Sequence, residues 1–395
     1  MAETLTVERA AKSDFDELMD MLLVCFQSKT PDHARFEELY PDLYRPTDRD
    51  MSHNYVVRLG GRIAGCVGVF PISVSICDQP VVVRGIGGVS ALPDLRGRGL
   101  MATLMDRATA DMVADGTALS WLGGDRRRYM TWGYEVTACG FHFGLGSRAP
   151  GYQNLQGKAS NVRTADLESD EDWDLLWRQA ARNPKLAVAG RETLRLKYQR
   201  LHQTVYVAGG PDEGGHIVMK ETPGSALLTA WAGEPEAVGG LVVHWMENHD
   251  LRDVAVDLPW YPDCYCPVFK QLMCGYSMSY SGSLAVVDLA RLLETYKPHL
   301  DQRVAEFGLK GSVRLAAGSI GAIPRQEVAL EADGRELHIA SGSTAGPVVE
   351  LSRHQIVELM FTPLVVGYGV RLDAKAKWLA NLFPLPFFLP KVFNV

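Results

Sequence analysis

The chain has 395 residues, more than one ordinary hydrophobic core accommodates, so two or three domains are expected. Hydrophobic residues make up 47% and charged residues 22% of the sequence, which is the composition of a soluble globular protein. The 47 acidic and 40 basic residues give a net charge of −7, so the chain lacks the basic excess typical of proteins that bind nucleic acid or anionic membranes. This negative balance attracts cationic amines.

The N-terminus has no basic region followed by an apolar stretch, and no run approaches the roughly 18 apolar residues of a membrane span. We therefore expect a cytoplasmic protein without a membrane partner. Seven scattered cysteines favour reduced thiols over a disulfide framework. Cys264 and Cys266, with Cys274, lack the paired spacing and the histidine of a zinc site, so no metal is expected.

The first elements form a helix and a set of strands. A strand at 5–9 precedes a helix from about Asp14, whose apolar residues fall on one face. Strands at 54–59, 65–70 and 74–77 follow, separated by glycines and by Pro71. They lead into a buried strand that carries Val81, Val82, Val83, Ile86, Val89 and Ala91.

A basic glycine turn, Arg96-Gly97-Arg98-Gly99, follows this strand, and apolar residues from Leu100 to Met112 then recur at helical spacing. A helix start leaves backbone N–H groups without partners and carries partial positive charge. Glycine backbone beside two arginines therefore suits a diphosphate, onto which each arginine can fork. The alternative is that the arginines are solvated and the glycines only shape a tight connection.

This turn resembles the CoA-binding signature of the GNAT superfamily of acyl-CoA-dependent N-acyltransferases, Arg/Gln-x-x-Gly-x-Gly/Ala after a strand that ends Val-x-x-x-Pro. Val89, Pro93, Arg96 and Gly99 match, whereas Met101 departs from the usual small sixth residue. The resemblance implies acetyl-CoA as co-substrate and backbone N–H groups at the strand end that orient its carbonyl. The implied CoA-binding residues are Val89, Ser90, Ala91, Arg96, Gly97, Arg98, Gly99, Leu100 and Met101.

The same glycines also fit the dinucleotide pattern Gly-x-Gly-x-x-Gly/Ala, with Ala102 at its end. In that motif the glycines follow the strand almost directly, but here Pro93 to Arg96 intervene. Asp125, the nearest candidate for binding the ribose, lies about 28 residues on rather than about 20. A nicotinamide cofactor is therefore the less favoured interpretation.

A second motif follows a strand at 118–122. The segment from Tyr129 to Glu135 fits the superfamily pattern Tyr-x-x-x-Gly-Phe/Tyr-Glu, and the resemblance assigns Tyr129 as general acid. A phenol with a pKa of about 10 is a poor base at neutral pH, but it can protonate a departing CoA thiolate. The alternative for Tyr129 is a packed core residue. The preceding Arg126, Arg127 and Arg128 are either solvated or contact the 3′-phosphate of CoA.

The predicted fold class is α+β, with the GNAT fold expected for residues 1–148. Residues 149–282 contain helices near 172–179 and 192–201, then strands at 204–208, 216–220, 226–231 and 242–245. Because no second Arg-x-x-Gly-x-Gly occurs there, the region is either a degenerate GNAT-like domain or an unrelated α+β module.

Residues 283–395 are expected to form the third domain. A helix at 285–296 is followed by strands at 312–316, 327–331, 336–340 and 348–351 and by a helix at 353–360. A helix, an antiparallel sheet and a second helix give an α+β layer arrangement.

The order of these three regions resembles the Eis-like (enhanced intracellular survival) acetyltransferases, whose third domain has a sterol-carrier-like fold. In that branch the C-terminal carboxylate returns to the active site and helps to deprotonate the incoming ammonium. The tail at 382–395 has no acidic side chain and is too apolar to remain in water at little cost. The resemblance therefore assigns the carboxylate of Val395 as base. The alternative is a tail that only fills an interface or a core.

These features predict direct acetyl transfer from acetyl-CoA to a primary amine. The resemblance suggests acceptors that range from aminoglycosides and polyamines to lysine side chains, and a homo-oligomer, either a dimer or a hexamer. Candidate walls of the acceptor site are Phe26, Phe36 and Tyr40, which are equally suited to a core. The competing hypothesis is an acyl-CoA or lipid carrier, or a regulatory protein, without transferase activity.

Overall fold

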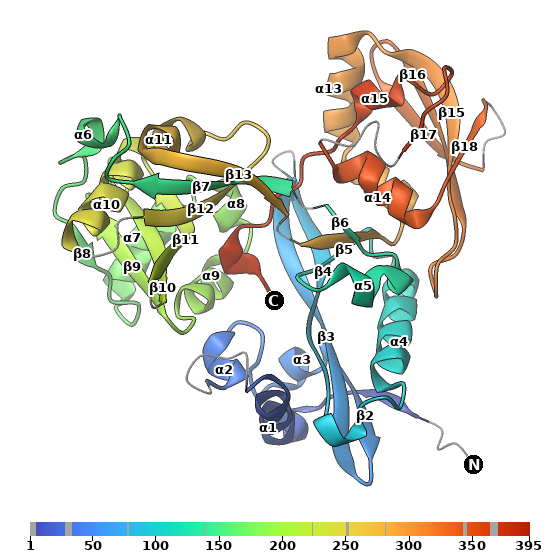
Figure 1. The fold of residues 1–395 in the computed structure, drawn as a ribbon, viewed down its shortest axis with the longest axis horizontal. Coiled ribbons are helices and arrows are strands. Elements are labelled where there is room, and N and C mark those ends of the chain that lie inside the picture. The colour runs from blue at the N-terminus through green and yellow to red at the C-terminus, as the bar shows by residue number, and fades with distance from the viewer. Residues whose placement is uncertain are drawn as a thin grey trace.

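The computed structural model describes residues 5–395 except 28–33, 77–78, 138, 223, 250–252, 281, 343–345 and 364–369. Three sheets organise this part of the chain, two with seven strands and one with four. Figure 1 shows the two large sheets at an angle to each other, with the four-stranded sheet beyond the upper end of the first. None of the described helices is both long enough and apolar enough to cross a membrane.

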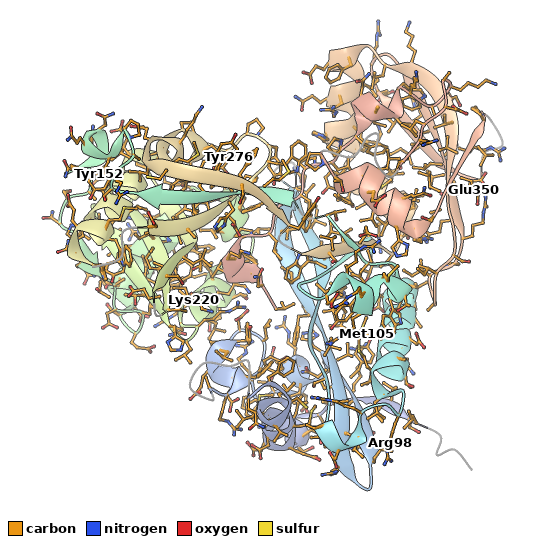
Figure 2. The ribbon with its side chains drawn as sticks, viewed as in Figure 1. Arg98, Met105, Tyr152, Lys220, Tyr276 and Glu350 are labelled. Carbon is orange, nitrogen blue, oxygen red and sulfur yellow. The ribbon has the colours of Figure 1, made fainter. Side chains whose placement is uncertain are left out.

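The first sheet carries the glycine turn. Its strands, in spatial order, are β1 (Val7–Arg9), β2 (Asn54–Leu59), β3 (Arg62–Ile76), β4 (Gln79–Ala91), β5 (Leu119–Leu122), β14 (Ser283–Val286) and β6 (Glu135–Val136). Helix α4 (Leu100–Ala114) packs on β2, β3 and β4, and its Met105 points toward the sheet (Figure 2). Helices α1 (Phe15–Phe26), α2 (Phe36–Leu39) and α3 (Asp48–Met51) lie on the other side of the β3–β4 ribbon (Figure 1).

The separate strands expected at 65–70 and 74–77 are wrong over the described residues, because β3 is continuous from Arg62 to Ile76. Pro71 lacks an N–H and usually interrupts a ladder. Here β2 pairs with β3 only as far as Gly68, so no neighbouring strand needs the missing N–H of Pro71 on that edge. Cys77, the last residue of the expected strand, lies outside the described residues.

The second sheet contains β13 (Met273–Tyr280), β7 (Cys139–Gly146), β12 (Asp253–Pro259), β11 (Ser225–Gly233), β10 (Gly215–Thr222), β9 (Gln203–Ala208) and β8 (Arg163–Thr164), in that order. Its helices are α6 (Tyr152–Leu155), α7 (Asp170–Ala180), α8 (Pro184–Ala187), α9 (Arg191–Tyr198), α10 (Pro235–Asn248) and α11 (Cys266–Leu272). The order of elements in this unit repeats that of the first. Three antiparallel strands, β9, β10 and β11, are followed by α10 and then by β12, which is parallel to β11, just as β2, β3 and β4 are followed by α4 and β5. This second unit is therefore GNAT-like.

Two boundaries differ from expectation. Strand β7 precedes residue 148 but pairs with β12 and β13, so it belongs to the second sheet. Strand β14 follows residue 282 but pairs with β5 and β6, so it completes the first sheet.

The strand expected at 242–245 is wrong, because these residues lie in helix α10. This helix is buried on nearly all sides, so it lacks the polar face that reveals helical periodicity.

The third sheet has the order β17 (Leu337–Ser341), β16 (Gln326–Asp333), β15 (Lys310–Ala317) and β18 (Val348–Leu351). Its strands contact α12 (Leu289–Thr295), α13 (Lys297–Phe307) and α14 (Arg353–Phe361), and α15 (Leu379–Leu382) packs on α13. The single helix expected at 285–296 is wrong at its start, because residues up to Val286 form β14 and Asp288 caps α12 by accepting the N–H of Arg291 at 3.0 Å.

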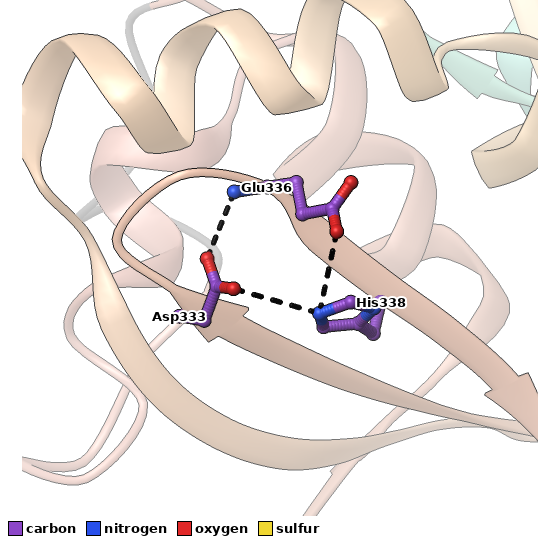
Figure 3. Close-up of side chains that lie close together, drawn as sticks. All are labelled: Asp333, Glu336 and His338. Carbon is purple, nitrogen blue, oxygen red and sulfur yellow. Dashed lines mark hydrogen bonds and ion pairs between the residues drawn. The ribbon is translucent and has the colours of Figure 1, made fainter.

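Within the described residues, one cluster of three side chains has ligand atoms close enough to hold a metal ion. It lies at the turn between β16 and β17 and consists of Asp333, Glu336 and His338 (Figure 3). All three are exposed. Asp333 also accepts the backbone N–H groups of Arg335 and Glu336 at 2.7 and 2.9 Å, which is a turn-forming role.

The segment after α15 leaves the third sheet and reaches the first. Phe383, Leu385, Phe387 and Leu389 are buried along it, and the hydroxyl of Tyr296 donates to the carbonyl of Pro386 at 2.8 Å. A short helix, η5 (Lys391–Phe393), then packs on α9 and β11. In Figure 1 the C-terminus lies between the two large sheets.

Candidate functional site

A bulge shapes the end of β4. Cys66 pairs with Ser90 and Gly68 with Gly87, so two residues of β4 stand opposite one residue of β3. The first of them, Gly88, has a φ of 60°, a conformation that favours glycine. A bulge takes a residue out of the ladder and bends the strand. The last residues of β4 thereby turn toward a cavity.

This cavity has a volume of about 630 Å³ and lies between the end of β4, the glycine turn, the start of α4 and the end of α1. The lining residues are Cys25, Phe26, Val89, Ser90, Ala91, Leu95, Arg96, Gly97, Gly99, Leu100, Met101, Ala102, Arg128 and Trp132. All the residues predicted to bind CoA are among them except Arg98. That side chain is exposed and lies beside the start of α4 (Figure 2).

The turn has the backbone conformation that its glycines predict. Gly97 and Gly99 have φ values of 79° and 80°, and Gly99 is the N-cap of α4. No atom lies within 4 Å of a Cβ placed on either glycine, so the requirement for glycine is conformational and the backbone stays open. The first N–H groups of a helix have no partner within it, which makes this end of α4 suitable for an anion.

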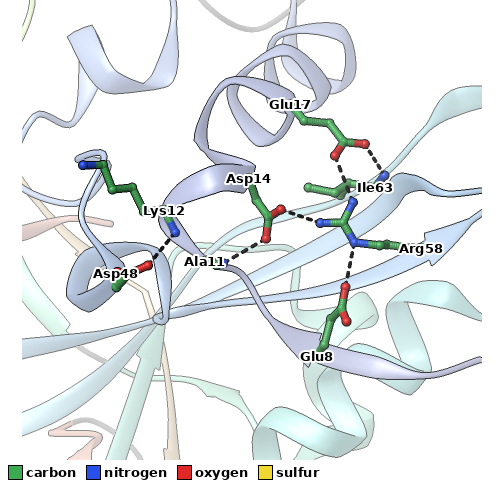
Figure 4. A network of polar contacts seen from close by, with 8 residues as sticks. All are labelled: Glu8, Ala11, Lys12, Asp14, Glu17, Asp48, Arg58 and Ile63. Carbon is green, nitrogen blue, oxygen red and sulfur yellow. Dashed lines mark hydrogen bonds and ion pairs between the residues drawn. The ribbon is translucent and has the colours of Figure 1, made fainter.

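An ion network fixes α1, whose last residue lines the cavity. The guanidinium of Arg58 on β2 contacts Glu8 at 2.6 Å, Asp14 at 2.7 Å and Glu17 at 2.9 Å (Figure 4). Glu17 also accepts the N–H of Ile63 at 2.6 Å. The start of α1 is therefore tied to β1, β2 and β3. Phe26, a predicted acceptor wall at the other end of the helix, lines the same cavity as the residues of the CoA signature.

The three arginines of α5 (Arg126–Tyr129) have different surroundings. Arg126 forms two hydrogen bonds to the carboxylate of Glu135, and Arg127 contacts Asp125 at 3.0 Å. Arg128 lines the cavity. Sequence reasoning did not single out Arg128 from its neighbours, although Asp125 and Glu135 in the printed sequence are the signals that could have done so.

Tyr129 ends α5 and is 7% exposed. Burial raises the pKa of its phenol, which neighbouring Arg128 partly opposes. Its ring packs edge-on against Tyr134, with ring centroids 6.4 Å apart. Tyr129 does not line the cavity itself, but Arg128 and Trp132 on either side of it do. The phenol therefore stays protonated at neutral pH, next to two residues that line the cavity.

Tyr134, in contrast, belongs to the core. Its hydroxyl lies 2.7 Å from Oγ of Ser120, which in turn donates to the carbonyl of Arg84 at 2.7 Å. The residue is 1% exposed, and burial raises the pKa of its phenol. This contact joins the second motif to β5 and β4.

Val395 lies on β4 before the bulge. A Cβ placed on Gly87 would be 3.0 Å from the carboxyl carbon of Val395, and one placed on Gly85 would be 2.7 Å from its Cγ2. Two glycines of β4 therefore leave the space that this residue fills. The structure brings Val395 to the same strand whose end lines the cavity.

The other two predicted acceptor walls have different positions. Phe36 is 6% exposed and packs between Phe26, Tyr40 and Tyr44, with ring centroids 5.0 to 5.8 Å apart. It is therefore a core residue. Tyr40 is half-buried, and its ring lies 5.0 Å below the guanidinium carbon of Arg200. Neither lines the cavity.

Residues 6–137 match the family model described as an acetyltransferase (GNAT) domain. A probable N-acyltransferase from Enterococcus faecalis V583 is 14% identical and has a TM-score of 0.70, with 98% of this chain and 99% of that chain covered. A GCN5-related N-acetyltransferase from Kribbella flavida is 17% identical, with a TM-score of 0.68 and 98% of both chains covered. Eis1 from Mycobacterium abscessus is 12% identical, with a TM-score of 0.58 and 90% and 89% covered.

No match was found among curated proteins. The family match spans the cavity, the glycine turn and the second motif, whereas at these identities the whole-chain matches concern the fold. The sterol-carrier-like character of the third sheet stays a prediction. The chain therefore contains a GNAT acetyltransferase domain at residues 6–137, within a mixed α/β fold that it shares along nearly its whole length with these proteins.

Proposed function

We propose that this protein is an acetyl-CoA-dependent N-acetyltransferase that acetylates a primary amine of an aminoglycoside, a polyamine or a lysine-like side chain. One observation carries the proposal. Strand β4 ends in the cavity at Val89, Ser90 and Ala91, and the carboxyl carbon of Val395 lies against Gly87 of the same strand. A donor site and a candidate base on one strand favour direct transfer, because both reactants must be held in attack geometry.

The cavity suits the donor. Its volume of about 630 Å³ lies within the roughly 300–1,000 Å³ of small-molecule sites. The open backbone at Gly97 and Gly99 and the start of α4 offer N–H groups to the diphosphate. Arg96 and Arg128, which both line the cavity, add positive charge.

The transfer then needs protons to leave the amine nitrogen and one to reach the sulfur. The neutral amine nitrogen attacks the thioester carbonyl carbon, and the carbon–sulfur bond breaks after the carbon–nitrogen bond forms. Backbone N–H groups at the end of β4 orient the carbonyl and stabilise the charge on its oxygen. The carboxylate of Val395 takes the ammonium proton through water before the attack, and Tyr129 gives its proton to the leaving sulfur. The second proton, which the nitrogen loses on becoming an amide, returns to the phenolate of Tyr129.

Release of free CoA thiol from acetyl-CoA tests this function. The purified protein is assayed with polyamines, aminoglycosides and lysyl peptides, beside a variant extended by a few residues beyond Val395. Amine-dependent release that the extension abolishes, with acetyl-CoA binding retained, supports both the transfer and the base. Equal release by both proteins supports the transfer and removes Val395 as base. Tight acetyl-CoA binding without release for any amine contradicts the transferase.

The same proposal includes the setting of the enzyme. We propose a cytoplasmic homo-oligomer, either a dimer or a hexamer, as the family resemblance implies. The net charge of −7 agrees with the absence of a nucleic-acid or membrane partner. Sedimentation velocity over a range of protein concentrations measures the subunit number. A monomer at all concentrations contradicts this part of the proposal.

A further inference from the structure

We propose that Arg200 is a positioning residue that holds the carboxylate of Val395 on β4, and that Asp42 and Lys197 lock Arg200 in place. The inference rests on the proposed function, in which that carboxylate is the base. It gives the second, motif-poor unit a part in catalysis, because Arg200 lies two residues beyond the end of α9.

Arg200 uses its whole guanidinium fork. Its Nη1 donates to the backbone carbonyl of Asn394 at 2.8 Å, one residue before Val395. Its Nε and Nη2 donate to the two carboxylate oxygens of Asp42 at 2.7 and 2.8 Å. A bidentate pair of this kind fixes the guanidinium plane. The third donor therefore has one direction, toward the last peptide.

The cluster is buried and joins three segments. Asp42 follows α2 in the first unit, and Arg200 and Lys197 come from the second unit. Lys197 Nζ lies 2.6 Å from Asp42, and the three side chains are 0 to 6% exposed. The N–H of Leu201 also donates to the carbonyl of Glu38 at 3.1 Å. These contacts leave Arg200 little freedom to follow a moving tail.

Charge supports the same arrangement. Burial lowers the pKa of Lys197 to about 8, so Lys197 is mostly protonated at neutral pH. With Arg200 and ionised Asp42 the cluster then carries one net positive charge away from water. A buried excess charge is costly unless an opposite charge is near. The carboxylate of Val395 lies one residue beyond the carbonyl that Arg200 holds, so we infer that it faces this excess positive charge.

The rest of the tail is held by other contacts. Lys391 Nζ lies 2.8 Å from Asp257 on β12, and Phe393 is 1% exposed. Arg200→Met should therefore leave the tail docked and free only the last peptide, because Asp42 and Lys197 remain as a neutral pair. Lys391→Met is the matched control, since it removes a tail contact of similar length four residues from Val395.

Amine-dependent turnover is measured for wild type, Arg200→Met, Arg200→Lys and Lys391→Met, with thermal unfolding as a check of folding. We expect kcat of Arg200→Met to fall about 10- to 100-fold, with the KM for acetyl-CoA within about twofold, because only the base is misplaced. Arg200→Lys should recover part of kcat, and Lys391→Met should stay within about threefold of wild type.

Hydrogen exchange at the amides of Asn394 and Val395 gives a readout that does not depend on activity. It should quicken in Arg200→Met and not in Lys391→Met. Folded Arg200→Met with wild-type kcat or unchanged exchange overturns the inference, and so does an equal loss of kcat in Lys391→Met. Loss of turnover on extension beyond Val395, with Arg200→Met unaffected, leaves the proposed function intact. Absence of turnover in wild type removes the proposed function, and the exchange experiment still decides the placement.

Discussion

Consecutive arginines can have different partners, because successive side chains of a helix point in different directions. On α5, Arg126 is bound by Glu135 and Arg127 by Asp125, whereas Arg128 lines the cavity beside Tyr129. The pair of Arg127 and Asp125 is exposed and contributes little energy, whereas Arg126 holds the buried carboxylate of Glu135 on β6. We therefore propose Arg128 as the arginine that contacts a phosphate of acetyl-CoA.

Arg128→Ala tests this division. The KM for acetyl-CoA should rise about tenfold, because a charge-assisted hydrogen bond to phosphate is lost. Arg127→Ala is the matched control and should change that KM less than twofold, since its side chain is 88% exposed and pairs with Asp125. Steady-state kinetics at saturating amine give both values, and equal KM values for the two variants would remove Arg128 from the site.

Tyr129→Phe separates acid catalysis from packing. The buried ring is retained and only the hydroxyl is lost, so kcat should fall about 100-fold while the Kd of acetyl-CoA stays the same. Tyr134→Phe is the control, because its hydroxyl bonds to Ser120 in the core. We expect it to cost about 1 kcal/mol of stability and to leave kcat nearly unchanged. Wild-type turnover in Tyr129→Phe would end the assignment.

Strand β4 performs several tasks at the scale of an element. It pairs with β3 on one side and with β5 on the other, and it bulges at Gly88 before reaching the cavity. Its glycines Gly85 and Gly87 make room for Val395. A strand interior normally avoids glycine, which gives it no side chain to pack, so these glycines mark the close approach of another chain segment.

Gly87→Ala tests that approach. The new methyl group would lie 3.0 Å from the carboxyl carbon of Val395 and 3.4 Å from Phe70, so the tail residue must shift. We expect kcat to fall about tenfold with little change in acetyl-CoA affinity. Gly275→Ala on β13 is a strand control with no atom within 4 Å of its Cβ, and it should retain full activity. Equal kcat values in the two variants would argue against a catalytic Val395.

Short sequence motifs predicted the residues around the cavity better than hydrophobic periodicity predicted which strands pair. The glycine turn and α4 depend on neighbours in sequence and lie where the sequence predicts them. The Tyr129 motif forms α5 next to the cavity, although Tyr129 itself does not line it. Strand β14 lies between β5 and β6 although more than 140 residues separate it from β6, and no periodicity in the sequence encodes such a partner. Arg200 was missed for the same reason, because Asp42 and Asn394 are distant in sequence.

At the scale of the whole molecule, buried ions join the units. Asp42 of the first unit holds Lys197 and Arg200 of the second, and Arg200 holds the tail. Burial alone would raise the pKa of Asp42, but the two cations outweigh it and lower that pKa from 3.8 to about 2. Docking of the units is therefore linked to the ionisation of one carboxyl group.

This linkage has a definite sign. Because the folded-state pKa of Asp42 lies below its unfolded value, the group stabilises the fold by about 2 kcal/mol above pH 4 and loses this contribution as the pH falls toward 2. Asp42→Asn should be less stable than wild type at pH 6, and the difference should narrow by about that amount near pH 2. Thermal unfolding at several pH values measures it, and a pH-independent difference would contradict the shift.

Strand β7 of the first region lies in the second sheet, and β14 of the third region lies in the first sheet. This crossing limits where recombination can divide the chain. A recombination breakpoint near Arg148 would carry β7 away from β12 and β13, and would leave β5 and β6 without the β14 that lies between them. Each half would bring an interior strand shaped for its former companion. We therefore expect recombination to replace the two GNAT-like units together rather than singly, even though each repeats the architecture of the other.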